Sequence, residues 1–166
     1  MTTRREFIGM PSAAMAALES GLKADVIKSP KPLDILFLGG TGFLVPHQLN
    51  YALARGHRVT MFNRGSNAGL FGDQVEDLLG NRDATIDSGL SGLEGARRWD
   101  VVVDNSGYVP RHVRDSVELH KDRCDRYVYV STVAVYDFGL GASNFPEDAH
   151  RADLEDPTVE EVTGQP

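Results

Sequence analysis

Three segments rich in apolar residues, each closed by glycine or polar residues, predict strands of a buried sheet. They occupy residues 33–40, 57–65 and 98–108. Continuous apolar runs of this kind are typical of strands that are covered on both faces of a parallel sheet. Residues 125–139 predict one further strand, whereas the weakly patterned residues 75–79 predict either a strand or a helix.

Two segments between these runs have helical spacing. In the first, residues 43–56, Pro46 falls in the first turn, where its missing N–H is harmless, and Gly56 serves as a C-terminal cap. Its inward face is predicted to hold Phe43, Leu44, Leu49, Ala52 and Leu53.

The second helical segment, residues 110–124, begins at Pro110 and ends in a pattern that includes Cys124. Its inward face is predicted to carry Val113, Val117 and Leu119, with the charged side chains directed outward.

Strands that alternate with helices predict an α/β fold with a doubly wound parallel sheet, which we expect to stop after a fifth strand. Ligands of such sheets bind beyond the carboxyl ends of the strands. We expect residues 33–145 to form this domain, residues 1–32 to be a signal-like segment and linker, and residues 146–166 to be an acidic loop or the start of a further region.

Charge is distributed unevenly along the chain. The 166 residues carry a formal charge of −7, and residues 144–166 hold seven acids against one arginine, a charge of −6. The rest is nearly neutral and offers no basic stripe for a phosphate backbone, so a nucleic-acid partner is not expected.

Neither cysteine nor histidine predicts a metal site. Cys124 is the single cysteine, which excludes an internal disulfide and a multi-cysteine site, and an inert thiol is expected. The histidines lack the spacing of metal ligands and are expected on helix surfaces or in loops. They are His47, His57, His112, His120 and His150.

The first residues have the composition of an export signal. Paired Arg4 and Arg5, followed by Phe7, Ile8 and an alanine-rich run, resemble a twin-arginine signal. The run is too short for an ordinary membrane-spanning helix, so stable membrane insertion is not expected. The sequence therefore predicts a periplasmic or exported protein; the alternative is a cytoplasmic protein with a disordered N-terminus.

A cluster of glycines predicts a ligand site. Gly39, Gly40 and Gly42 follow a buried strand and open a helix, so their backbone N–H groups can meet a pyrophosphate at the positive end of that helix. The alternative is a tight strand-to-helix turn that binds nothing.

Four segments together resemble the N-terminal part of the atypical or extended short-chain dehydrogenase/reductase superfamily, in the NAD-dependent epimerase/dehydratase group. In chain order they are FLGGTGFLV, ARGHRVTMFNRG, WDVVVDNSGY and YVYVSTVAVY. The resemblance covers about residues 33–145. It implies a Rossmann-type domain, a nicotinamide cofactor, and hydride transfer at a carbonyl or sugar carbon of a small-molecule substrate that the sequence does not identify.

The resemblance also implies a set of cofactor-binding residues. They are Gly39, Gly40, Thr41, Gly42, Phe43 and Leu44 at the glycine turn, Asn63 and Arg64 at the second strand, Asn81, and then Asn105, Ser106 and Gly107. Val45 stands where the family has a third glycine, so a widened turn or weaker binding is expected, with binding retained. The guanidinium of Arg64 suits a 2′-phosphate and favours NADP over NAD, with a solvated turn arginine as the alternative.

Catalytic groups are few. The resemblance places Thr132, with Ser131 beside it, at the hydroxyl that polarises a substrate carbonyl. The family's Tyr-x-x-x-Lys pair is missing, because no tyrosine is followed by a lysine four residues later. We therefore expect an oxidoreductase or epimerase that is incomplete in this chain.

Two other functions stay open. One is a non-catalytic module that holds a dinucleotide or binds RNA. The other is a ligand-free fragment that dimerises through a bare sheet edge, and a homo-oligomer is compatible with each reading.

Overall fold

The computed structural model describes residues 26–39, 42–66, 69–136 and 146–151, together with residues 153, 155, 156, 158 and 160. The twin-arginine pattern at Arg4 and Arg5 lies outside the described residues, as do Gly40 and Thr41 of the predicted glycine turn.

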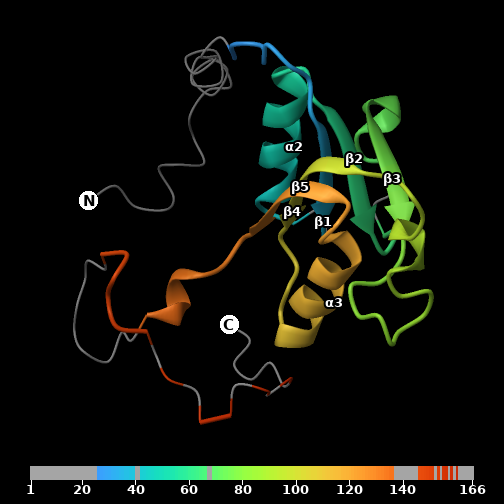
Figure 1. Cartoon of the computed structure of the whole chain (residues 1–166). Helices are drawn as coiled ribbons and strands as arrows, with labels where there is room; N and C mark the ends of the chain where they lie inside the picture. Colours follow the sequence, from blue (N-terminus) through green and yellow to red (C-terminus); the bar gives the residue numbers. More distant parts are fainter. Residues whose placement is uncertain are drawn as a thin grey trace, which may run out of the picture.

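Five parallel strands form one sheet with the order β3-β2-β1-β4-β5 (Figure 1). The strands are β1 (Asp34–Leu38), β2 (Arg58–Asn63), β3 (Val75–Leu79), β4 (Trp99–Asp104) and β5 (Cys124–Tyr129). The predicted α/β fold with a doubly wound parallel sheet is confirmed, and residues 75–79 form a strand. This strand order is that of a Rossmann-like sheet, which reverses direction between β1 and β4.

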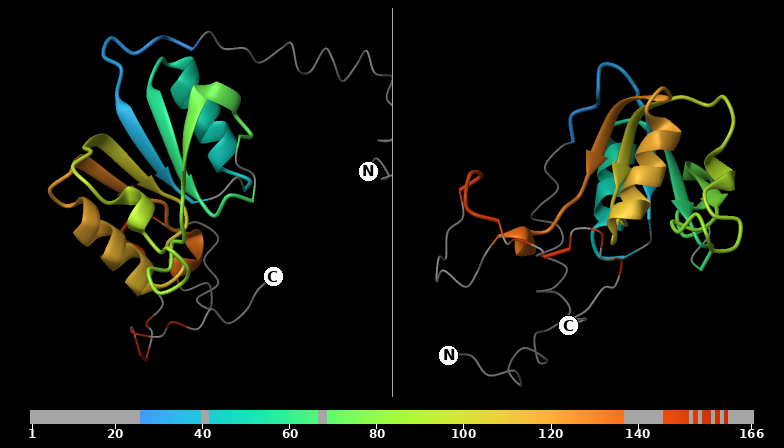
Figure 2. Two further views of the ribbon diagram at one scale, coloured as in Figure 1. Left: turned by 90° about the vertical axis from the view of Figure 1, so that its right-hand side faces the viewer. Right: turned by 60° about the horizontal axis from the view of Figure 1, so that its bottom comes forward.

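Two helices cover opposite faces of the sheet (Figures 1 and 2). Helix α2 (Val45–Ala54) connects β1 to β2, and helix α3 (Pro110–His120) connects β4 to β5. The two connections run in opposite directions across the sheet. Because parallel crossovers are right-handed, opposite directions place the two helices on opposite faces.

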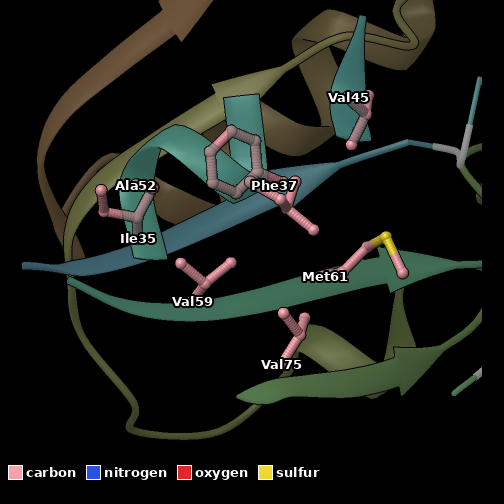
Figure 3. Close-up of a cluster of buried hydrophobic side chains, with 8 residues drawn as sticks. Ile35, Phe37, Val45, Ala52, Val59, Met61 and Val75 are labelled. Atoms are coloured by element: carbon pink, nitrogen blue, oxygen red, sulfur yellow. The ribbon is translucent and has the colours of Figure 1, made fainter. Parts of the chain in front are cut away.

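One hydrophobic cluster lies between α2 and the sheet (Figure 3). Alternate residues of β1 and β2 point into it, since successive side chains of a strand face opposite sides. The helix contributes Val45, Leu49 and Ala52. The strands contribute Ile35, Phe37, Val59, Met61 and Val75.

A second cluster covers the other face of the sheet. The intervening strand residues Leu36, Leu38 and Phe62 are fully buried in it. The connection from β3 to β4 contains only a 3-10 turn, Ser91–Leu93, yet Leu90 and Leu93 from this connection complete the cluster. The irregular connection between β3 and β4 therefore covers this part of the sheet in place of a helix.

The first helix starts later than its apolar pattern predicts. Phe43 is 87% exposed and Leu44 is 49% exposed, and the helix begins at Val45. The prediction that Phe43 and Leu44 face inward is therefore wrong, because both precede the helix and so do not share its inward face. The roles of Pro46 in the first turn and of Gly56 as the terminating glycine, with φ +88°, are confirmed.

The inward face of α3 is more polar than expected, although Leu119 packs against the second cluster as predicted. Val117 is exposed, which contradicts its predicted position, and Ser116 and His120 are fully buried. The prediction of a surface position for His120 is also wrong. Its Nδ1 lies 2.8 Å from the Ser116 carbonyl oxygen, a hydrogen bond within the helix that satisfies one buried ring nitrogen.

Both ends of β5 differ from the sequence prediction. Cys124 is the first residue of this strand rather than the end of a helix. Its thiol is half-buried, and burial raises its pKa, which fits the expected inert character. The strand ends at Tyr129, and Val133–Val135 form a 3-10 turn, so the prediction of a strand to residue 139 is wrong.

Exchanging Val45 for glycine is expected to lower the free energy of unfolding by about 2–3 kcal/mol. Val45 is 4% exposed and packs in the cluster under α2, so the exchange removes a buried side chain and adds a flexible helical residue. Urea unfolding of both proteins measures the difference. Asn50→Gly, at an exposed position of the same helix, is the control and should cost a few tenths of a kcal/mol; equal losses would mean that Val45 contributes nothing by packing.

Candidate functional site

A cavity of about 420 Å³ opens at the carboxyl edge of the sheet. Its position beside the end of β1 and the segment after β4 is the point where the strand order reverses, the usual place for a ligand in such sheets. The lining residues are Gly39, Gly42, Phe62, Asn63, Arg64, Ser66, Gly80, Asn81, Arg82, Asp83, Ser106, Tyr108 and His112. We call this cavity the edge pocket.

Gly39 has to be glycine. Its φ is +100°, a conformation that strains other residues, and a Cβ on it would lie 2.4 Å from the Cβ of Ser106. The chains after β1 and β4 therefore approach closely here. Gly42 is different, because a Cβ there would meet nothing within 4 Å. Both glycines line the edge pocket, Gly39 in close contact with Ser106 and Gly42 beside open space.

Both helices present unneutralised amino ends at this edge of the sheet. Leu44 and Val109 occupy the N-cap positions of α2 and α3, and neither supplies a side-chain cap. The first turns contain no acidic residue. Since the first N–H groups of a helix lack helical partners and carry partial positive charge, these ends favour an anion in the neighbouring pocket.

The two residues predicted at the end of β2, Asn63 and Arg64, have different surroundings. Asn63 donates through Nδ2 to Asp77 and accepts through Oδ1 from the Gly65 N–H, so its side chain joins the ends of β2 and β3. Arg64 is exposed on the pocket wall and has no hydrogen-bond partner within the described part of the chain. Of the two residues predicted here, Arg64 is the one with a free group.

The turn after β3 is stiffened by its own side chains. Asn81 accepts through Oδ1 from the Asp83 N–H, and this leaves its Nδ2 for other contacts. Both oxygens of Asp83 accept from Arg111, at 2.7 and 3.0 Å, and the bonds from Arg111 hold the pKa of the carboxyl far below its usual range. Arg111 also pairs with Glu160, and its own pKa is raised by the two carboxylates.

A buried ion pair lies at the pocket, where Arg82 belongs to the lining and Asp104 stands behind it. Arg82 Nη2 is 2.7 Å from Asp104 Oδ2, and the two side chains are 10% and 0% exposed. Arg82 also donates from Nε to Ser106 Oγ and from Nη2 to the His112 carbonyl oxygen. The Tyr127 hydroxyl donates to Asp104 Oδ2, and burial together with this bond raises the pKa of Tyr127.

Sequence reasoning missed Arg82, although Asp104 gives a signal for it. Asp104 closes an apolar strand, and a carboxylate at such a position is buried only when it is paired. That rule predicts a cation nearby. It does not say which of the chain's arginines and lysines fills the role, because Arg82 lies 22 residues away in an irregular turn.

Of the three residues predicted to bind the cofactor after β4, one lines the edge pocket and two do not. Ser106 lines the edge pocket and is 9% exposed. Asn105 and Gly107 do not line it. A Cβ on Gly107 would lie 2.4 Å from Val113 Cγ2, and its carbonyl accepts from the Tyr129 hydroxyl, so helix packing requires this glycine. Asn105 is half-buried, and its amide has no partner among the residues the structure describes.

The two hydroxyls predicted as catalytic are not brought to the pocket. Ser131 and Thr132 are exposed and lie outside the pocket lining. Thr132 Oγ1 accepts from the Ala134 N–H at 3.2 Å and caps the following 3-10 turn. Phe43 and Leu44, predicted at the glycine turn, are also absent from the lining. The structure therefore gathers binding groups and leaves these four residues apart from them.

In the described parts of the chain no cluster of histidine, cysteine, aspartate or glutamate side chains could hold a metal ion. No helix there has the length and apolar character needed to cross a bilayer.

Comparison of the chain with family models, with curated proteins and with solved structures finds no match.

Proposed function

We propose that the edge pocket binds a nicotinamide dinucleotide through its adenosine diphosphate half, with NADP preferred over NAD. The observation that carries the proposal is the cavity at the β1/β4 reversal, lined by Gly39 and Gly42 at the edge of the sheet where both uncapped helices begin. Backbone N–H groups at such a turn suit a pyrophosphate, which needs several donors and no bulky side chain.

The size and chemistry of the pocket agree with this ligand. A volume of about 420 Å³ lies in the range of small-molecule sites. The free Nδ2 of Asn81 can donate to the adenine edge, and the apolar Phe62 lies in the same wall. Asn63 is held by Asp77 and Gly65 and would act by positioning the β2 tip.

The oxidoreductase part of the proposal rests on the resemblance alone. A bound nicotinamide would supply hydride transfer, and the chain would have to supply a proton donor beside the substrate. Ser131 and Thr132 would need to approach the pocket from the segment after β5, and the sequence contains no Tyr-x-x-x-Lys pair. These facts favour dinucleotide binding without turnover by this chain alone.

Titration of the purified full chain with NADPH and NADH, followed by nicotinamide fluorescence, tests the binding. We expect saturable binding of both, tighter for NADPH. Absence of binding by either dinucleotide, in a protein with a cooperative unfolding transition, would refute the proposed function.

Arg64→Ala is expected to raise the dissociation constant of NADPH about tenfold or more and to change that of NADH by no more than about twofold. The reason is that a charge-assisted bond to the 2′-phosphate contributes roughly 1.5–3 kcal/mol. The two dissociation constants, measured at one salt concentration, give the result. Arg126→Ala removes another exposed arginine, on β5 and outside the pocket lining, and serves as the control. If the binding of NADPH and NADH weakened equally, Arg64 would have no role in recognising the 2′-phosphate.

A further inference from the structure

The guanidinium of Arg82 has one nitrogen that its neighbours do not use. Nε bonds to Ser106 and Nη2 bonds to Asp104 and His112, whereas Nη1 is buried without a partner among the described residues. Arg82 is 9% exposed and lines the edge pocket. An unpaired buried donor is costly, so it calls for a partner such as an ordered water, an ion or a ligand group.

A second unpaired nitrogen belongs to His112, which also lines the edge pocket. His112 Nδ1 is buried with no partner in the described chain, and His112 Nε2 lies 3.8 Å from Asp83 Oδ2. The backbone of His112 holds Arg82 through its carbonyl oxygen, 3.0 Å from Nη2. The two unpaired nitrogens therefore belong to neighbouring residues, since the Arg82 guanidinium bonds to the backbone of His112 in the first turn of α3.

We propose that Arg82 Nη1 and His112 Nδ1 form an oxyanion site within the edge pocket, which takes a phosphate or carboxylate group of the bound ligand. This inference rests on the proposed function of the same pocket. We call the site the Arg82–His112 corner.

The charges around the corner are compatible with an anion. Asp104 and Asp83 are the neighbouring carboxylates, and each is paired with an arginine, Arg82 and Arg111. His112 can donate from Nδ1 when that nitrogen carries the proton. An arginine guanidinium always carries its protons in a protein, so it is always a donor. An oxyanion would satisfy Nη1 and would lie at the positive end of α3.

The oxyanion could come from two sources with one chemistry. The pyrophosphate of the dinucleotide is one, since Ser106 Oγ joins Arg82 to the Gly39 turn. The anionic group of a second small molecule, bound beside the dinucleotide, is the other. In both cases Arg82 Nη1 and His112 Nδ1 would donate to an anionic oxygen.

The test is the binding of inorganic phosphate to the full chain, measured by calorimetry with and without saturating NADPH. The variant Arg82→Met with Asp104→Asn removes the ion pair without leaving an unpaired buried charge. We expect its phosphate affinity to fall about tenfold or more, the loss of one charge-assisted hydrogen bond. The matched control makes the same exchange in the exposed pair Arg58 and Asp34 at the amino edge, and should change nothing.

His112→Leu keeps the ion pair and protects the test against a folding failure of the double variant. We expect phosphate binding to weaken severalfold in it, with the unfolding temperature of the wild type. No phosphate binding by the wild type, or equal affinity in the wild type and in these variants, would overturn the proposal.

Competition identifies the source. If NADPH displaces phosphate, and if the variants bind ADP more weakly but adenosine as well as the wild type does, the Arg82–His112 corner binds the pyrophosphate. Phosphate that still binds beside NADPH assigns it to a second ligand. Phosphate binding to a chain that binds no dinucleotide would support the corner and refute the proposed cofactor, so the two failures are distinguishable.

Discussion

Replacing Asp104 by alanine is expected to lower the free energy of unfolding by about 3–5 kcal/mol, the usual cost of leaving one partner of a buried ion pair alone. Arg82 would keep its charge in a site that is 10% exposed, with Ser106 and the His112 carbonyl as its remaining partners. The Tyr127 hydroxyl would also lose Asp104 as an acceptor and would keep Ser116 Oγ as its partner. Urea unfolding, followed by circular dichroism, measures the change.

The control for this experiment is Asp34→Ala. Asp34 receives two bonds from Arg58, so the pairing is at least as close, but the side chains are 33% and 67% exposed. An exposed pair contributes about 0–1 kcal/mol, because water replaces the lost partner. Similar losses at Asp104 and Asp34 would show that water reaches Arg82 and that the pair is not buried in solution.

Gly39→Ala is expected to cost about 2–4 kcal/mol of unfolding free energy. Two independent causes add, namely the strain of a positive φ in a residue with a Cβ and the collision of that Cβ with Ser106. Since Ser106 also accepts from Arg82 Nε, a shift of Ser106 would disturb the ion pair below it. Chemical unfolding gives the loss, and NADPH titration of the same variant should show weaker binding.

Gly42→Ala is the matched exchange in the same turn. Its added methyl group meets nothing within 4 Å, and Gly42 does not have a positive φ, so the unfolding free energy should stay within about 0.5 kcal/mol. A loss at Gly42 as large as that at Gly39 would contradict the steric explanation.

The centre of the sheet could be predicted from the sequence because β1 and β2 are buried on both faces. Residues such as Leu36 and Phe37 point to opposite sides of β1, yet both are in contact with a hydrophobic cluster. Burial on both faces gives an unbroken apolar run, which is the strongest strand signal. β3 lacked that signal because its burial is partial, with Glu76 and Leu79 exposed at the sheet edge.

The errors occurred where apolar side chains do not pack. Phe43 and Leu44 continue the spacing of α2, but they precede its first residue and stay exposed. In α3 the buried face contains Ser116 and His120, which a hydrophobic pattern counts as outward. Their burial depends on Tyr127, whose hydroxyl lies 3.0 Å from Ser116 Oγ. A contact between different elements leaves no local signal.

The candidate site was predicted in part for the same reason. The glycine turn and Arg64 belong to short motifs whose chemistry is visible in a few neighbouring residues. Arg82 acquires its position from Asp104 and Ser106, which follow it by more than twenty residues. A buried charge is chosen by the assembled fold, so it becomes recognisable only when both partners are placed.

The central place of β1 has a consequence for synthesis on the ribosome. β1 pairs on one side with β2, 24 residues later, and on the other with β4, 66 residues later. As the chain emerges, β1, β2 and β3 can associate while the second edge of β1 still waits for Trp99–Asp104. During that interval Leu36 and Leu38 lack a covering partner, and an open apolar edge invites association with other chains. We therefore expect the nascent protein to be most prone to association with other chains in the interval between the third and fourth strands.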